Sequence, residues 1–172
     1  MSGFTSHLVP PDQVRTVYPL VRETVAGLDL KSWVVFARRI AHPRRATQTG
    51  ILAVTRAGRS LPCGVFLYHR EAQLTGGAVL VAEHFVALDV VDPQPVVQAL
   101  VRELDALAKR LGCTAIRVVV PGDCSLVQSG LQAAGHRPRG LALWKPVENG
   151  TPPRPSGVRP DRIAAALGKR PG

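Results

Sequence analysis

The sequence of 172 residues is long enough for one domain with an apolar core and too short for two. Hydrophobic residues make up 45% of the chain, which excludes a largely disordered or fibrous protein. The formal net charge of +10 favours anionic partners such as nucleic acid, phosphates or an acidic membrane surface, although a general bias toward arginine explains the same excess.

Targeting signals and cysteine pairs are missing from the sequence. No apolar run approaches the ~20 residues that cross a bilayer, and the N-terminus lacks a basic segment followed by an apolar one, so a cytoplasmic protein without a membrane partner is expected. Cys63, Cys113 and Cys124 are widely spaced and form no CxxC pair. Neither a disulfide framework nor a metal site is therefore expected.

The first part of the chain is predicted to be helical. Valines at helical spacing indicate a helix over residues 12–28, bent at Pro19 and ended by Gly27. A second helix follows over residues 30–41 and ends before Pro43. Two helices are thus expected to precede the first long strand.

Strands follow these helices. Residues 50–55 and 63–70 are rich in β-formers and flank a glycine turn, which predicts an antiparallel hairpin. Residues 77–91 predict a third and longer strand, which pairs with the second.

The remainder alternates helices and strands. Residues 95–111 carry a strong apolar stripe at helical spacing, and the strand at residues 115–120 then completes a βαβ unit with parallel pairing. Asp123 is expected to cap a helix over residues 124–134, and residues 140–146 predict the last strand.

The composition changes near residue 147. Prolines and glycines become frequent there, which is typical of a flexible linker. We therefore expect one domain over residues 1–146 and a flexible basic tail over residues 147–172, with room for one short helix at residues 160–169.

This order of elements resembles the GNAT superfamily of acyl-CoA N-acyltransferases. The stretches that carry the resemblance are "VTRAGRSLPCGVFLY", "LVRELDALAKRLGCTAIRVVV" and "LQAAGHRP". The resemblance implies an α/β fold, a GNAT-like mixed β-sheet with a splayed central strand pair flanked by helices. Acyl-CoA would enter the gap between those strands, and an amine acceptor would approach from the opposite side.

The turn that binds the coenzyme diphosphate in that family is shortened here. The family pattern Q/R-x-x-G-x-G/A wraps backbone N–H groups around the diphosphate at a helix N-terminus. The corresponding "VDPQPVVQAL" has no glycine, Pro93 and Pro95 lack an N–H, and Asp92 is interpreted as a helix cap. We therefore expect the helix to start without the usual diphosphate contacts. The resemblance implies that acetyl-CoA or another acyl-CoA is bound by residues of this segment, namely Ala87, Leu88, Asp89, Val90, Val96 and Val97.

N-acyl transfer needs a base for the acceptor and an acid for the departing thiolate. Glu83 in the long strand is the candidate base, although a solvent-facing residue of an alternating strand explains it as well. In a regular strand His84 points to the other face. The general acid of the family is a tyrosine, and at its position this chain has Leu131. Cys124, near the start of the same helix, is therefore a candidate substitute acid or reactive thiol, and a buried small hydrophobe is the alternative.

Between Leu30 and Arg70 the sequence has no acidic residue. Arg38, Arg39, Arg44 and Arg45 are the candidate acceptor- or anion-binding residues, and a solvated arginine face is the alternative.

Two functions follow from these patterns. The first is an acyl-CoA-dependent N-acyltransferase, or a divergent descendant, acting on an unidentified amine acceptor for which the arginines favour acidic groups. The alternative is a non-catalytic GNAT-like module that binds a protein, nucleic acid or another anionic ligand. The last strand is short, and an edge left open by it would allow a homodimer.

Overall fold

The computed structural model describes residues 3–120 and 124–140. The chain divides into two units, Met1–Arg137 and Pro138–Gly172, and nearly all described residues belong to the first. The predicted last strand and the predicted tail from residue 147 lie outside the described residues. The elements of the first unit are β1 (Phe4–Leu8), α1 (Tyr18–Arg22), α2 (Leu30–Ile40), η1 (Pro43–Arg45), β2 (Thr49–Arg56), β3 (Pro62–Ala72), β4 (Ala78–Ala87), α3 (Gln94–Arg110), β5 (Ala115–Val118) and α4 (Ser125–Ala133).

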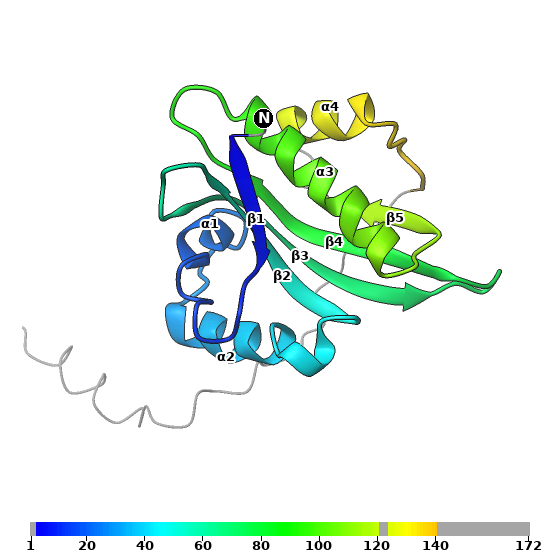
Figure 1. Ribbon diagram of the computed structural model, residues 1–172, viewed down its shortest axis with the longest axis horizontal. Coiled ribbons are helices and arrows are strands. Elements are labelled where there is room, and N and C mark those ends of the chain that lie inside the picture. Colours follow the sequence, from blue (N-terminus) through cyan, green and yellow to red (C-terminus); the bar gives the residue numbers. More distant parts are fainter. Residues whose placement is uncertain (1–2, 121–123, 141–172) are drawn as a thin grey trace, which may run out of the picture. The chain divides into compact units, whose positions relative to one another are not determined.

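The five strands form one mixed sheet in the order β1-β2-β3-β4-β5. The pairs β1–β2, β2–β3 and β3–β4 are antiparallel, whereas β4 and β5 are parallel and joined through α3. Figure 1 shows α1 and α2 on one side of this sheet and α3 running across the other. The predicted hairpin and the predicted βαβ unit are therefore both present.

The N-terminal segment differs from the prediction. A short strand, β1, precedes the helices and pairs along β2 from Phe4↔Arg56 to Leu8↔Leu52. Its side chains are mostly exposed, so it lacks the apolar alternation by which a strand is predicted. The first helix is only Tyr18–Arg22, and Pro19 lies in its first turn instead of bending a longer helix, because proline is tolerated where the N–H has no intrahelical partner.

The second helix forms as predicted. Asp29 caps α2 by accepting the N–H of Ser32 at 3.0 Å, and the helix ends at Ile40 shortly before Pro43. The buried Trp33 indole N–H donates to the carbonyl of Val14 at 2.7 Å, which attaches the loop before α1 to α2.

Alternation along the strands produces a separate core on each face of the sheet. The α3 side buries one set of strand residues: Leu52, Val54, Phe66, Tyr68, Leu80, Ala82 and Phe85. The α1–α2 side buries the alternate set: Ile51, Ala53, Val65, Leu67 and Val86. Between Ala82 and Phe85 the alternation changes phase, because these two residues are three apart and face the same side.

The helices on the α3 side pack closely. The apolar stripe of α3 is buried as predicted, and a Cβ added to Gly64 of β3 would lie 2.8 Å from a Val96 methyl.

The N-cap position of α4 is occupied by Cys124, while Asp123, the predicted cap, lies outside the described residues. No helix within residues 3–120 and 124–140 is long and apolar enough to span a membrane.

Candidate active site

An irregularity in β4 interrupts its pairing with β3. Val65 pairs with Val86 and Leu67 with Glu83, so β3 advances by two residues where β4 advances by three. The extra residue forms a β-bulge, and His84 within it has a φ of 50°. A left-handed backbone costs a residue with a side chain about 1–2 kcal/mol. Such strain concentrates at functional sites, and it directs attention to this part of β4.

The bulge places Glu83 and His84 on the same face of the sheet. Glu83 pairs with Leu67, which belongs to the α1–α2-side core, and directly paired residues point to the same side. His84 Nδ1 lies 3.2 Å from the hydroxyl oxygen of Thr24, which follows α1. The prediction that His84 points away from Glu83 was therefore wrong, because it assumed a regular strand.

The surroundings of His84 favour its neutral form. Burial lowers its pKa, and the neighbouring Glu83 charge only partly opposes this. The Thr24 hydroxyl also lies 3.0 Å from the carbonyl of Val21, and it has one proton to donate. When the hydroxyl donates this proton in a hydrogen bond to the Val21 carbonyl, the Nδ1–H of His84 donates to the hydroxyl oxygen of Thr24. The Nε2 of His84 then keeps a lone pair that can accept a proton.

Next to the bulge, β4 and β5 separate. Their pairing covers Val79 to Ala82, and one further bond joins the N–H of Val119 to the carbonyl of Ala82. Beyond Ala82, residues 83–87 pair with β3 only, as far as the described residues show. This is the predicted splay of the central strands. It leaves one backbone edge of β4 to hold an extended ligand.

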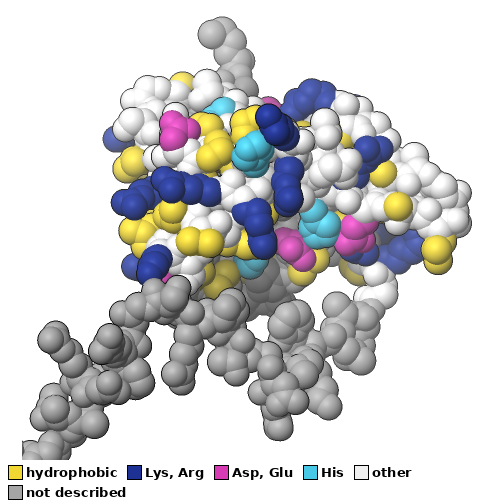
Figure 2. Space-filling view, turned by 90° about the horizontal axis from the view of Figure 1, so that it is seen from below, with side chains coloured by type: hydrophobic (Ala, Val, Ile, Leu, Met, Phe, Trp, Pro, Cys, Tyr) yellow, Lys and Arg dark blue, Asp and Glu magenta, His cyan; other side chains and the backbone are white. Residues whose placement is uncertain are grey.

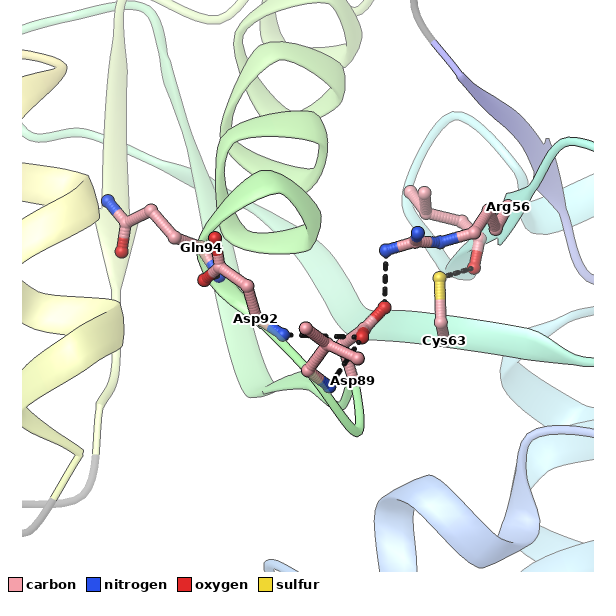
Figure 3. A network of polar contacts seen from close by, with 7 residues as sticks. Arg56, Cys63, Asp89, Asp92 and Gln94 are labelled. Carbon is pink, nitrogen blue, oxygen red and sulfur yellow. Dashed lines mark hydrogen bonds and ion pairs between the residues drawn. The ribbon is translucent and has the colours of Figure 1, made fainter.

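The turn after β4 contains an anion of its own. Asp89 Oδ1 accepts the N–H of Val91 at 3.0 Å and that of Asp92 at 3.4 Å, while Asp89 Oδ2 forms an ion pair with Arg56 (Figure 3). These contacts, with the Val91 N–H first, lower the pKa of Asp89. Its side chain is 13% exposed. Two peptide donors of the turn are thus occupied by a carboxylate of the chain.

The first turn of α3 has no N–H to spare. Pro93 and Pro95 have none, and the N–H of Gln94 donates to Asp92 Oδ1 at 2.9 Å. The N–H groups of Val96 and Val97 both donate to the carbonyl of Pro93. Every N–H from Val91 to Val97 is therefore accounted for.

Two sequence-based assignments in this segment change. The N-cap position of α3 is Pro93 and not Asp92, although the Asp92 carboxylate does accept the first helical N–H. Val96 and Val97 are fully buried in the core, so they present neither a side chain nor an N–H to a ligand, and we no longer propose them as coenzyme contacts.

The remaining positions expected near a coenzyme vary in their surroundings. Ala87 is the last residue of β4 and partly buried. The N–H of Leu88 donates to the carbonyl of Cys63 at 2.8 Å, which extends the contact with β3. Val90 is fully exposed.

The structure does not bring Cys124 to Glu83. Cys124 packs against the α3-side core, whereas Glu83 faces the α1–α2 side. Leu131, at the position of the family's tyrosine, is 5% exposed and belongs to the same α3-side core.

The four candidate arginines lie together in sequence and in structure. Arg38 and Arg39 are in the last turn of α2, and Arg44 and Arg45 are in η1. All four are exposed, and none forms an ion pair with another described residue. Figure 2 shows Lys and Arg side chains spread over the face seen from below, with histidine and acidic side chains among them. Within residues 3–120 and 124–140 no cluster of side chains could hold a metal ion.

Comparisons with known proteins identify the fold. No protein-family model matches the sequence, and no curated protein matches it. An aminoglycoside N-acetyltransferase in complex with CoA is similar with a TM-score of 0.70 and 12% identity, over 86% of this chain and 97% of that one. Glucosamine-6-phosphate N-acetyltransferase from Arabidopsis thaliana gives 0.66 and 12%, over 83% and 97%. A transcriptional regulator from Bacillus halodurans gives 0.70 and 14%, over 84% and 99%.

The chain has the GNAT fold. The predicted mixed sheet, with its splayed strand pair and flanking helices, is thereby confirmed. At these identities the likeness establishes the fold and leaves the activity to be argued from the site.

One of these similar proteins is in complex with CoA, and the described residues offer contacts for only one part of such a ligand. The open edge of β4 suits the pantetheine arm, because its amide groups can pair with backbone. The diphosphate does not fit in the usual way, because no N–H from Val91 to Val97 is left for it and two carboxylates, Asp89 and Asp92, lie in the turn.

Proposed function

We propose that this protein transfers an acyl group from a thioester to an amine at the bulge of β4. The observation that carries the proposal is the placement of Glu83 and His84 on the α1–α2 side, next to the edge of β4 that β5 leaves unpaired. The acyl-transferring proteins among the similar structures support this reading of the site.

The pair Glu83–His84 serves as the base in this proposal. The lowered pKa of His84 keeps its ring neutral before the reaction, so its Nε2 can take a proton from the acceptor ammonium. The Glu83 carboxylate attracts the ammonium and stabilises the proton once it is on His84. The proton then passes to solvent. The freed amine attacks the thioester carbonyl, the N–C bond forms and the C–S bond breaks. The second proton of the nitrogen ends on the departing sulfur.

The acceptor is proposed to be an amine that carries anionic groups. The exposed arginines of α2 and η1 offer charge for such groups. The acyl group and the identity of the amine are left to the assay below. Acetyl-CoA, the donor expected from the sequence, is one arm of that assay.

The test is a transfer assay with a panel of amines and two donors, S-acetylpantetheine and acetyl-CoA. Mass spectrometry should detect the acyl-amine, because the three cysteines of the chain would react with a thiol dye. Glu83→Gln and His84→Gln should each lower kcat at least about 100-fold, the usual contribution of a positioned base. Glu103→Gln on α3 is the charge-matched control and should keep full activity.

The same assay tests the expected acid. Cys124→Ala should keep its activity, since Cys124 packs on the other side of the sheet from the pair. Equal rates for Glu83→Gln, His84→Gln and the Glu103→Gln control would refute the proposal. So would the absence of transfer with every amine and both donors.

A second candidate is the non-catalytic module that binds an anionic partner. The occupied turn after β4 favours it, as do the exposed arginines without a described ion-pair partner. A labelled DNA duplex should then bind in a salt-dependent way, and replacing Arg38, Arg39, Arg44 and Arg45 by glutamine should abolish the binding. Binding that survives this replacement would remove the candidate.

A further inference from the structure

We propose that the acyl donor is a pantetheine thioester recognised without its nucleotide, because Asp89 occupies the place that a diphosphate needs. This inference rests on the proposed function and names its substrate class. It concerns only the part of the donor beyond the arm that lies along β4.

The contacts of Asp89 are those of a bound anion. One carboxylate oxygen accepts two consecutive peptide N–H groups, and the other pairs with the guanidinium of Arg56. Two peptide donors and one guanidinium are also a typical set for binding a phosphate group. The turn therefore supplies from its own sequence the negative charge that a coenzyme supplies in the family pattern.

Arg56 is fixed in position for this role. It ends β2, and its guanidinium lies 5.4 Å above the ring of Phe4 in β1. Arg56, Asp89 and Phe4 thus come from the end of β2, the turn after β4 and the edge strand β1, respectively. A nucleotide would have to displace Asp89 before it could use either N–H group or the guanidinium nitrogen that pairs with Asp89.

The start of α3 offers no free backbone donor. The first turn of α3 contains two prolines, and its other N–H groups donate to Asp92 and to the carbonyl of Pro93. The carboxylate of Asp92 adds a second negative charge where a diphosphate would approach. A diphosphate is therefore disfavoured by lack of donors and by charge.

Recognition of the arm is unaffected by these changes. The edge of β4 over residues 83–87 binds through backbone groups, which the turn does not alter. A pantetheine arm occurs free, in CoA, and as phosphopantetheine attached to a carrier protein. The first and third of these lack the nucleotide and share the chemistry that the site retains.

Calorimetric titration with S-acetylpantetheine and acetyl-CoA at one salt concentration tests the proposal. The two dissociation constants should agree within about threefold, and adenosine 3′,5′-bisphosphate should not compete. Tighter binding of acetyl-CoA by about tenfold or more, or competition by the bisphosphate, would overturn this inference while leaving the proposed function intact. Binding of neither thioester would overturn both.

A third ligand distinguishes the two sources. An acetylated carrier domain that binds more tightly than S-acetylpantetheine identifies carrier-bound phosphopantetheine as the donor, and equal affinity identifies the free arm. Either result supports recognition without the nucleotide.

Removal of the internal anion should reverse the selectivity. Asp89→Ala frees two N–H groups and Arg56, so the preference for acetyl-CoA over S-acetylpantetheine should rise about tenfold. Asp105→Ala on α3 makes the same charge change away from the turn and should leave the ratio unchanged. Asp89→Asn keeps an acceptor for the N–H groups but removes the charge that pairs with Arg56, so it should raise the ratio by a smaller factor and serves if Asp89→Ala does not fold. An unchanged ratio in the folded Asp89 variants would overturn the inference.

Discussion

Glycine and alanine at position 84 should report whether the backbone is left-handed there. At a φ of 50°, a side chain destabilises the folded state by about 1–2 kcal/mol relative to glycine. Glycine loses about 0.5–1 kcal/mol through the greater freedom of the unfolded chain. The midpoints of the two ranges differ by about 0.75 kcal/mol, which predicts that His84→Gly is more stable than His84→Ala by about that amount.

Urea denaturation measures this difference. With an m-value of about 2 kcal/mol per molar, the midpoint of His84→Gly should lie about 0.4 M above that of His84→Ala. Ala87→Gly, in the same strand without a left-handed backbone, is the control and should lose about 0.5–1 kcal/mol. If His84→Ala is as stable as His84→Gly, β4 is regular, and Glu83 and His84 do not share a face.

Three further predictions concern stability. Burial lowers the pKa of His84 from 6.5, so below about pH 6.5 the unfolded chain takes up a proton that the folded chain does not, and the free energy of unfolding should fall. Urea denaturation at pH 7.5 and pH 5.5 measures this fall. It should be smaller for His84→Gln than for the exposed control His7→Gln. Equal falls would contradict the burial of His84. Trp33→Phe removes the donor of the 2.7 Å hydrogen bond to the Val14 carbonyl and should lower the free energy of unfolding, measured by urea denaturation, by about 1–3 kcal/mol. An unchanged free energy would mean that water replaces the indole. Gly64→Ala places a methyl group 2.8 Å from a side chain of α3 and should lower the free energy of unfolding, in the same urea assay, by about 1–3 kcal/mol. An unchanged free energy would contradict the close packing of α3 on β3.

The parts of the fold that follow from local patterns could be predicted from the sequence. The stripe of α3 and the glycine-bounded hairpin of β2 and β3 each satisfy a single period, and tertiary contacts only reinforce it. β1 could not be predicted, because an exposed edge strand needs no apolar alternation and is stabilised by its partner β2. The N-terminal valines suggested a long helix, but they are buried largely through turns around the short α1.

The candidate site was only partly predictable. Glu83 was chosen as the candidate base from its place in the long strand, and that role stays a prediction; the bulge that brings His84 to the same face was missed. Two adjacent polar residues inside an otherwise apolar strand, Glu83 and His84, are the local signal that could have revealed it. The missing glycine loop was evident in the sequence. The ion pair of Asp89 in this turn was not, because its partner Arg56 is 33 residues away in the chain.

The central claim, that an acyl thioester binds along the open edge of β4, is tested most directly by a backbone amide NMR titration with S-acetylpantetheine. The account predicts saturable shifts of amides within residues 83–87, with smaller changes from Val91 to Val97, whose N–H groups are already bonded. Saturable shifts confined to other parts of the chain, or none within residues 83–87, would contradict it.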